Sequence, residues 1–268
     1  MFALLLGAMS CNDNSDVVNN PVEEMASATI TVAIPDTTRA TDEDAFDASV
    51  LGSEYELRYI LGVRNDSDNC TTTILDTKYS TATTVAFDIR LVERRNYRIV
   101  VWADVVEKSN HKDRFYNTAN GLEKVAVKKD EWGLNDAMRD AFFAYIDVYS
   151  FSSQSDIEGL NLTRPLAKLK VEQKGGTLPS QVAVAYDSVA TVFNAYEGSV
   201  SEYKSKSLSC VDVADAANGV ILTDYIFASK DGDIVDISLN TYLNDAKNVL
   251  NLSDISLKRN TLTTIQLK

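Results

Sequence analysis

Apolar and polar residues alternate along most of the chain, and this period of two is the strongest constraint on its fold. In "TVAFDIRLV" (84–92), Val85, Phe87, Ile89 and Leu91 occupy every second position. Successive side chains of a β-strand point to opposite faces, so such a stretch predicts a strand with one buried face. Comparable stretches are "ATITVAI", "EYELRYILGV", "LAKLKVEQ", "QVAVAYDSV", "VDISLN" and "LTTIQLK". The chain is therefore predicted to be mainly β.

One stretch is apolar at almost every position. "NYRIVVWADVV" (96–106) predicts a strand that is covered on both faces, because a half-exposed strand would alternate. Trp102 lies within it and is expected in the core rather than in a ligand site. The tyrosines, most of which follow the same alternation as the apolar residues, are expected in the core as well.

Helical periodicity is scarce, whereas turn signals are frequent. One short helix is expected around Leu134–Phe142, and "DYIFA" and "NTYLNDAKNVLN" fit either a strand or a helical turn. Gly175-Gly176 and Asn218-Gly219 mark turns, and Asp231-Gly232 predicts a hairpin between two strands.

Many short strands separated by turns are typical of β-sandwiches, and 268 residues suit two of them. The predicted fold class is all-β, with two consecutive sandwich domains and few short helices. We expect the N-terminal sandwich at residues 27–159 and the C-terminal sandwich at residues 160–268. Before them we expect a signal segment at residues 1–11 and a flexible tether at residues 12–26, which is rich in Asn, Asp and Glu.

The first residues resemble an export signal. Phe2–Met9 is apolar but too short for the roughly 20 residues of a membrane span, and it resembles the h-region of a signal peptide. Cys11 follows small residues in an order that resembles a bacterial lipobox, so we predict lipidation at Cys11; the alternative is a signal that is cleaved without lipidation. The positively charged start of a signal is missing, so the natural start is expected upstream of Met1. Acids directly after Cys11 resemble the surface-export signal of Bacteroidetes lipoproteins.

The charge of the chain disfavours some partners. With 39 acidic and 26 basic residues, the formal net charge is −13. Nucleic acids and anionic membrane surfaces need a basic face, whereas an acidic exterior suits a soluble protein. Apart from Cys11, the cysteines are Cys70 and Cys210, which are interpreted as two separate thiols or as one disulfide.

Catalytic and metal-binding motifs are lacking in the sequence. The single histidine, His111, lies in the charged segment "EKSNHKDRFYN" and is interpreted as a solvated loop residue, because a triad or a zinc site needs several partners. The acidic clusters at 65–69 and 231–236 lack the spacing of a calcium loop and fit turns. Asp187-Ser188-Val189 fits a loose O-glycosylation pattern as well as a strand. We therefore predict no enzyme, no cofactor and no metal site.

Six segments in order resemble one family: "LRYILGV", "FDIRLVERRNYRIVVWADV", "LNDAMRDAFFAYIDV", "LTRPLAKLKV", "VATVFNAYEG" and "KRNTLTTIQ". From about residue 27 to its end, the chain is similar to the fimbrillin-like lipoproteins of Bacteroidales, a domain-of-unknown-function group related to the major and minor fimbrial subunits. The resemblance implies two transthyretin-like β-sandwich domains and transport to the outer membrane as a lipoprotein. It also implies a structural rather than an enzymatic role.

The resemblance further implies proteolytic processing. In that family a protease cuts after an arginine near the end of the first strand, and a strand of the next subunit fills the groove. Arg39 in "IPDTTRATDED" matches this position, so we predict cleavage between Arg39 and Ala40; the alternative is an ordinary surface arginine in a linker. The lipid anchor and strand 28–34 would then leave together, and the exposed edge would bind a donor strand by β-augmentation.

The C-terminal end departs from the family pattern. Members that polymerise carry further sequence that supplies the donor strand, whereas this sequence stops at Lys268, soon after "RNTLTTIQ". Either "LTTIQLK" is the donor, or the donor is missing and the protein caps or anchors a fibre.

These observations predict a structural fimbrial (pilus) subunit or cell-surface adhesin, lipid-anchored at the outer membrane and located in the fimbrium if processed. The expected partners are other fimbrial subunits, in a homo- or hetero-polymer, and host proteins or glycans. The alternative is a monomeric surface lipoprotein that binds glycans, which exposed aromatic residues clustered on one face of the second sandwich would support. A hydrolase would need two carboxylates in one cleft, about 5–10 Å apart.

Overall fold

The computed structural model describes residues 23–35, 46–67, 71–153, 157, 159–244 and 246–267. Within these ranges β-strands are the main secondary structure, and no helix is long and apolar enough to cross a bilayer. The strands are β1 (Met25–Ala33), β2 (Tyr55–Asn65), β3 (Thr71–Ser80), β4 (Thr84–Val92), β5 (Tyr97–Glu107), β6 (Tyr116–Asn117), β7 (Val125–Val127), β8 (Ala141–Val148), β9 (Leu160–Asn161), β10 (Leu166–Gln173), β11 (Gln181–Asn194), β12 (Ser199–Asp212), β13 (Val220–Phe227), β14 (Asp233–Leu243), β15 (Ala246–Leu257) and β16 (Leu262–Leu267). The short 3-10 helices are η1 (Ala48–Leu51), η2 (Leu122–Lys124), η3 (Lys129–Glu131), η4 (Ala137–Arg139) and η6 (Ala216–Asn218). The predicted all-β sandwich fold is confirmed.

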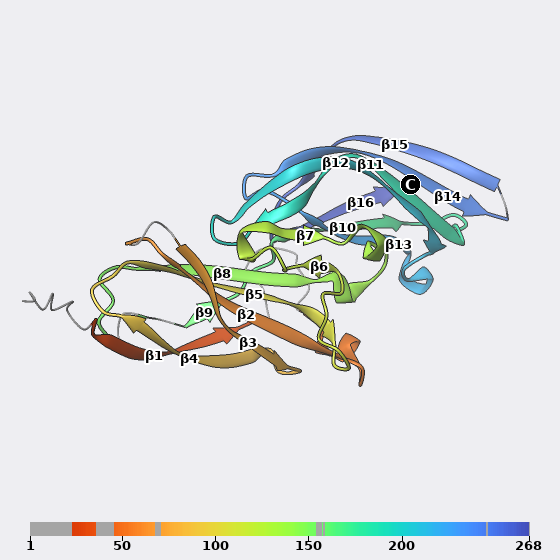
Figure 1. Ribbon diagram of the computed structural model, residues 1–268. Helices are drawn as coiled ribbons and strands as arrows, with labels where there is room; N and C mark the ends of the chain where they lie inside the picture. The colour runs from red at the N-terminus through yellow and green to blue at the C-terminus, as the bar shows by residue number, and fades with distance from the viewer. Residues whose placement is uncertain are drawn as a thin grey trace, which may run out of the picture.

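Two sheets form the first sandwich, at the lower left of Figure 1. One sheet has the strand order β4-β1-β9 and the other has the order β3-β2-β5-β8. Their inward side chains form one buried cluster, to which β1, β2, β4 and β5 all contribute. The alternation in the sequence produces this arrangement, because every second side chain of β1 and β4 is buried and the others face solvent.

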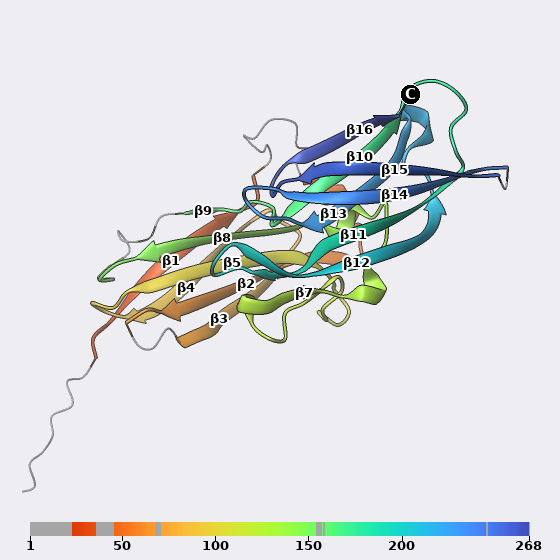
Figure 2. The same cartoon turned by 90° about the horizontal axis from the view of Figure 1, so that it is seen from above.

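The second sandwich is built from one nine-stranded sheet that divides into layers. Strand β11 pairs with β12 along its length, with β14 over Gln181–Tyr186 and with β13 and β7 near Ala190–Phe193. Because β11 changes partners, β15, β14, β11 and β12 form one layer and β16, β10 and β13 form the other (Figures 1 and 2). A second apolar cluster fills the space between these layers.

A third apolar core joins the two halves. Ile60, Val100 and Trp102 point from β2 and β5 away from the first core, and they form one cluster with Phe193 and Phe227 of the second half. Strand β5 is therefore covered on both faces, as its continuous apolar sequence predicts, and the buried position of Trp102 is confirmed. Strand β7, from the first half of the chain, also pairs with β11 across this junction.

The structure differs from two sequence predictions about local structure. The helix expected around Leu134–Phe142 is wrong: the only helical part is the three-residue η4, and the chain then enters β8, which pairs with β5. "DYIFA" lies in β13 except for its last residue, and "NTYLNDAKNVLN" spans the β14–β15 connection. The hairpin at Asp231-Gly232 is also wrong, because β13 pairs with β10 while β14 pairs with β11 and β15.

The segment that contains Asp231 and Gly232 crosses from one layer of the second sandwich to the other instead of reversing within one sheet. The other two turn predictions are confirmed, since Gly175, Gly176 and Gly219 all have positive φ angles in the connections after β10 and η6.

Candidate assembly site

Strand β1 is the central strand of its sheet. It runs antiparallel to β4, in continuous register from Met25–Val92 to Ala33–Thr84. On its other side it pairs in parallel with the two-residue strand β9, through Val32–Leu160 and Ala33–Asn161. Strand β1 is thus held by a long pairing with β4 and a short pairing with β9. Strand β4 pairs with no other strand in the described part of the chain.

The inward side chains of β1 and of the residue after it fill the first core. Ile30 and Val32 are 0% exposed, and Ala28 and Ile34 are 5% and 3% exposed. Burying an isoleucine or valine side chain contributes roughly 1.5–3 kcal/mol, so the three larger side chains contribute roughly 5–9 kcal/mol to the retention of β1. Removing β1 would leave a groove lined by the apolar cluster and bordered by the unpaired edges of β4 and β9.

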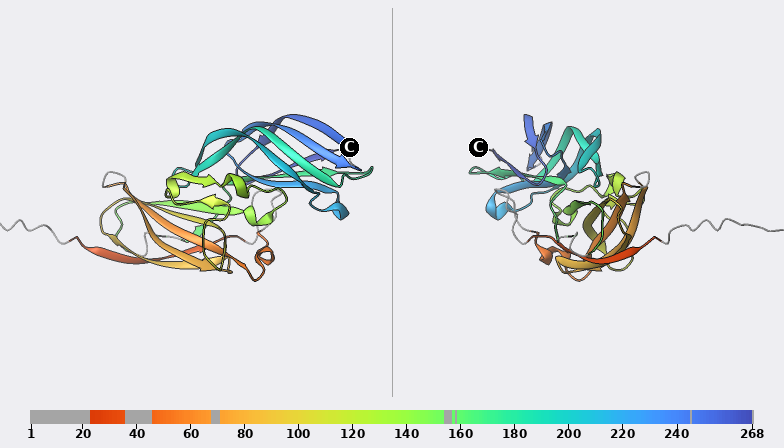
Figure 3. Two further views of the ribbon diagram at one scale, coloured as in Figure 1. Left: turned by 45° about the vertical axis from the view of Figure 1, so that its right-hand side comes forward. Right: turned by 90° about the vertical axis from the view of Figure 1, so that its left-hand side faces the viewer.

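The sheet that contains β1 lies on the outer side of the first sandwich, away from the second half. Figure 1 and the left view of Figure 3 show β1 and β4 along the lower border of the molecule, with the β3-β2-β5-β8 sheet between them and the second half. The third core, which joins the halves, contains no residue of β1, β4 or β9. Strand β1 is therefore separate from the junction between the halves.

The chain is anchored on both sides of the predicted cleavage position. After β1, the Ile34 amide donates to the Thr83 carbonyl at 2.8 Å. The chain is next described at Phe46, whose ring packs edge-on against Phe142 at 5.6 Å, and the Asp47 side chain then caps η1. Between these two anchors lies the segment that contains Arg39 and Ala40; both residues, like Cys11 and Cys70, lie outside the described residues, and their roles stay predictions.

His111 and the two acidic clusters have ordinary structural contacts. His111 is stacked on Tyr79 at 3.8 Å and lies 2.8 Å from the Glu56 carboxylate, in a turn at the end of β5. In the two acidic clusters, the Asn65 side chain accepts from the amide of Ser67, and the Asp233 carboxylate accepts from the amide of Ser229. These are turn contacts, and no group of three metal-binding side chains exists among the residues that the structure places.

The fully buried carboxylates are each paired with an arginine. Asp104 accepts two hydrogen bonds from Arg58, at 2.9 and 2.7 Å. Asp140 binds Arg164 at 2.7 Å, and Asp224 binds Arg139. Burial raises the pKa of Asp104 and Asp140, and the neighbouring guanidinium groups counteract this rise.

Each carboxylate is thus held by a fixed cation inside the protein. The pattern is that of structural ion pairs.

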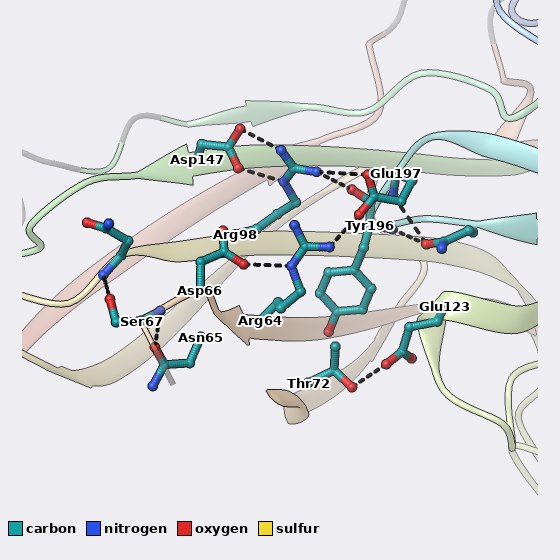
Figure 4. A network of polar contacts seen from close by, with 12 residues as sticks. Arg64, Asn65, Asp66, Ser67, Thr72, Arg98, Glu123, Asp147, Tyr196 and Glu197 are labelled. Carbon is teal, nitrogen blue, oxygen red and sulfur yellow. Dashed lines mark hydrogen bonds and ion pairs between the residues drawn. The ribbon is translucent and has the colours of Figure 1, made fainter. Parts of the chain in front are cut away.

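A polar network borders the junction between the halves (Figure 4). Arg98 of β5 donates to Asp147 of β8 at 2.6 and 2.8 Å, while Arg64 of β2 donates to Asp66 at 2.7 Å. Both arginines also reach Glu197 in the turn between β11 and β12. Sequence reasoning missed this network, because the arginines and Glu197 are more than 90 residues apart in the chain.

The comparisons with known proteins agree with this architecture. The family model described as "Family of unknown function (DUF6562)" matches residues 19–267. The chain belongs to this family. A search of curated proteins found no match.

Two solved structures share the fold of this DUF6562 member. The fimbrial anchor protein Mfa2 of Porphyromonas gingivalis is similar with a TM-score of 0.51 and 11% identity, over 85% of this chain and 82% of that one. A candidate cell adhesion protein of Bacteroides ovatus ATCC 8483 is similar with a TM-score of 0.50 and 14% identity, over 91% of this chain and 92% of that one. At these identities the likeness concerns the fold, and it confirms the resemblance to the fimbrillin-like group.

Among the described residues, the exposed aromatic residues of the DUF6562 member lie mainly in the first half. Tyr79, Tyr145 and Tyr149, which are more than a third exposed, belong to the first half, and Tyr203 alone represents the second half among the described residues. Cys210 is exposed and free on the edge strand β12.

Proposed function

We propose that this DUF6562 member is a non-enzymatic fimbrial subunit or adhesin of the bacterial cell surface. It is exported as a lipoprotein through Cys11, is cleaved between Arg39 and Ala40, and then receives a donor strand from another subunit in place of β1. A fimbrial location and fimbrial partners are supported by the shared fold with Mfa2, which is a fimbrial anchor protein, and with the Bacteroides ovatus protein.

The observation that carries the proposal is the position of β1. This strand has its apolar side chains in the core, lies in the outer layer and leads directly into the segment that contains Arg39. A cleavage there would convert β1 from part of the chain into a bound peptide that another strand can replace. Hydrogen bonds to β4 would then supply affinity, and the pockets of Ala28, Ile30, Val32 and Ile34 would select alternating apolar side chains.

The C-terminal strand is a poor candidate for the donor. β16 pairs in parallel with β10 over its whole length, and its Ile265 and Leu267 side chains pack against the second core. Its inward face offers only two apolar residues and Thr263, whereas the β1 groove takes four apolar side chains in a row. The donor for this groove is therefore expected from a different strand.

The mature N-terminus in cells tests the processing step. Mass spectrometry of protein purified from its host should find Ala40 as the first residue. Finding only protein that is lipidated at Cys11 would overturn the processing step.

The Arg39→Ala variant tests assembly. It should keep the fold but remain uncleaved and absent from fibres. Normal fibres built from Arg39→Ala protein would contradict the proposal, and Arg94→Ala, an exposed arginine beside β4, is the matched control.

A further inference from the structure

The edge strands of this protein differ in how well they are protected against pairing with another chain. Long edge strands usually carry charged side chains, which prevent pairing with another chain. Strands β3, β4, β8, β12 and β15 border their sheets, and each contains at least one charged residue. Strand β16, "LTTIQL", contains none, and it is the only uncharged edge strand of five or more residues in the described ranges.

The outer edge of β16 has free backbone groups. On its inner side, the carbonyls of Thr261 and Leu267 accept from the amides of Lys168 and Lys174 at 3.0 and 3.3 Å. Backbone groups of an extended strand alternate in direction, so those of Leu262, Thr264 and Gln266 point away from β10. No strand of the described chain pairs with them, and β16 forms the border of the second sandwich in Figure 2.

The same border exposes apolar surface. Five side chains beside the second core are only partly buried, and they come from the two strands that border the layers there: Leu250, Leu252, Ile255, Ile265 and Leu267. The Thr263 hydroxyl donates to the Ser256 carbonyl at 2.9 Å, so β15 and β16 approach each other at one end of this seam. A strand added beside β16 would cover Ile265 and Leu267 and extend the core.

We propose that β16 pairs with β16 of a second copy of this chain, antiparallel and centred on Thr264. In a two-fold contact each residue meets a residue of the same short strand, so an uncharged edge brings no like charges together and needs no matching of charged side chains. The lack of charged residues on the β16 edge matters because the chain has a net charge of −13, so its copies repel each other. The other edges carry charged side chains, such as Glu202, Lys204 and Lys206 of β12.

The register follows from the free backbone groups. Centring the contact on Thr264 places Thr264 opposite Thr264 of the second copy and Leu262 opposite Gln266 of the second copy. All three outward-facing residues then exchange backbone hydrogen bonds, and Thr263 meets Ile265 of the second copy on the core side. The contact lies on the second sandwich, whereas the β1 groove lies on the outer layer of the first, so both contacts can exist in one assembly.

The test measures the oligomeric state of the full, uncleaved chain by sedimentation up to about 1 mM, where weak association is detectable. We expect a concentration-dependent dimer. Thr264→Pro removes an amide that β10 does not use and should weaken the dimer by about tenfold or more, whereas Thr264→Val keeps the amide and the dimer. Thermal unfolding of both variants reports whether the monomer fold is intact.

A charge-pair experiment identifies the occupant of the edge. Thr264→Lys should weaken self-association at low salt, and mixing Thr264→Lys with Thr264→Glu protein should restore a heterodimer, because residue 264 of each copy lies opposite the other. A chain that is monomeric at all concentrations would overturn the proposal. A dimer that Thr264→Pro, Thr264→Lys and Thr264→Glu each leave unchanged would overturn it too, and would indicate exchange of another element such as β1.

Discussion

At the scale of single residues, one glycine allows a close contact between the halves. Tyr196 is 1% exposed, and its hydroxyl oxygen is buried without a hydrogen-bond partner. A Cβ added at Gly62 would lie 2.5 Å from this oxygen. The ring is enclosed by the third core and cannot move away without disturbing it.

Gly62→Ala should therefore destabilise the protein by about 1–3 kcal/mol, as expected for an overpacked core. Urea denaturation measures this change. Gly133→Ala is the matched control, because nothing lies within 4 Å of its added Cβ. Adding Tyr196→Phe to Gly62→Ala removes the clashing oxygen and should recover most of the loss; a double variant as unstable as Gly62→Ala would contradict this explanation.

A second residue-scale prediction concerns Glu202. Hydrogen bonds from Lys124 and Lys204, at 2.7 and 2.9 Å, lower the pKa of this exposed carboxylate to about 2. A lowered folded-state pKa means that the contribution to stability is present above the ordinary pKa of 4.5 and is lost as the pH falls toward 2. NMR titration should find this low pKa, and Lys124→Ala should raise it. An unchanged pKa in Lys124→Ala would show that Lys204 alone accounts for the shift.

At the scale of secondary structure elements, the β1 site depends on the alternation of buried and exposed side chains along β1. Ile30 is fully buried, whereas its neighbour Thr31 is exposed. Ile30→Ala should destabilise the intact chain by about 2–5 kcal/mol, and Thr31→Ala should change its stability by less than about 0.5 kcal/mol.

The same two variants test how β1 is held after cleavage. In chain that has been cleaved at Arg39, the Ile30→Ala strand should dissociate faster than the Thr31→Ala strand when an excess of β1 peptide is added. Fluorescence of a labelled peptide follows this exchange. Equal exchange rates would show that the core-facing pockets do not hold β1.

The agreement between local sequence pattern and burial also explains which elements were predictable from sequence. β1, β4 and β5 were predicted because their local pattern and their burial agree. The helix over Leu134–Phe142 failed because pairing of β8 with β5 outweighs local helical preference. Asp231-Gly232 failed as a hairpin because a turn signal does not reveal whether the next strand joins the same layer.

Of the candidate site, too, only part could be predicted from the sequence. The inward face of β1 can be read from its sequence, whereas the edge of β16 and the paired arginines cannot. Asp104, within the mostly apolar strand β5, indicated that a buried charge requires a partner, but nothing local identifies Arg58 as that partner.

At the scale of the whole molecule, the junction joins the halves into one unit. Besides the third core, the Arg139 side chain donates to Asp224 and to the carbonyl of Tyr225, at 2.7 Å to the latter. Asp224 also accepts from Tyr186 at 2.7 Å, so β11, β13 and η4 meet at this carboxylate. Because these contacts are separate from β1, a subunit that exchanges β1 would keep its two halves in fixed positions.

The buried pair of Arg139 and Asp224 allows a test of whether this contact joins the two halves. Arg139→Met leaves the Asp224 charge inside the protein without its guanidinium partner and should reduce the free energy of unfolding by about 3–5 kcal/mol. Arg94→Met, which removes an exposed pair with Glu24, should change it by less than about 1 kcal/mol. Urea denaturation followed by both far-UV circular dichroism and tryptophan fluorescence measures the loss and should show coincident transitions. An Arg139→Met protein as stable as the control, or separate transitions in the unaltered chain, would show that the halves are not joined through this contact.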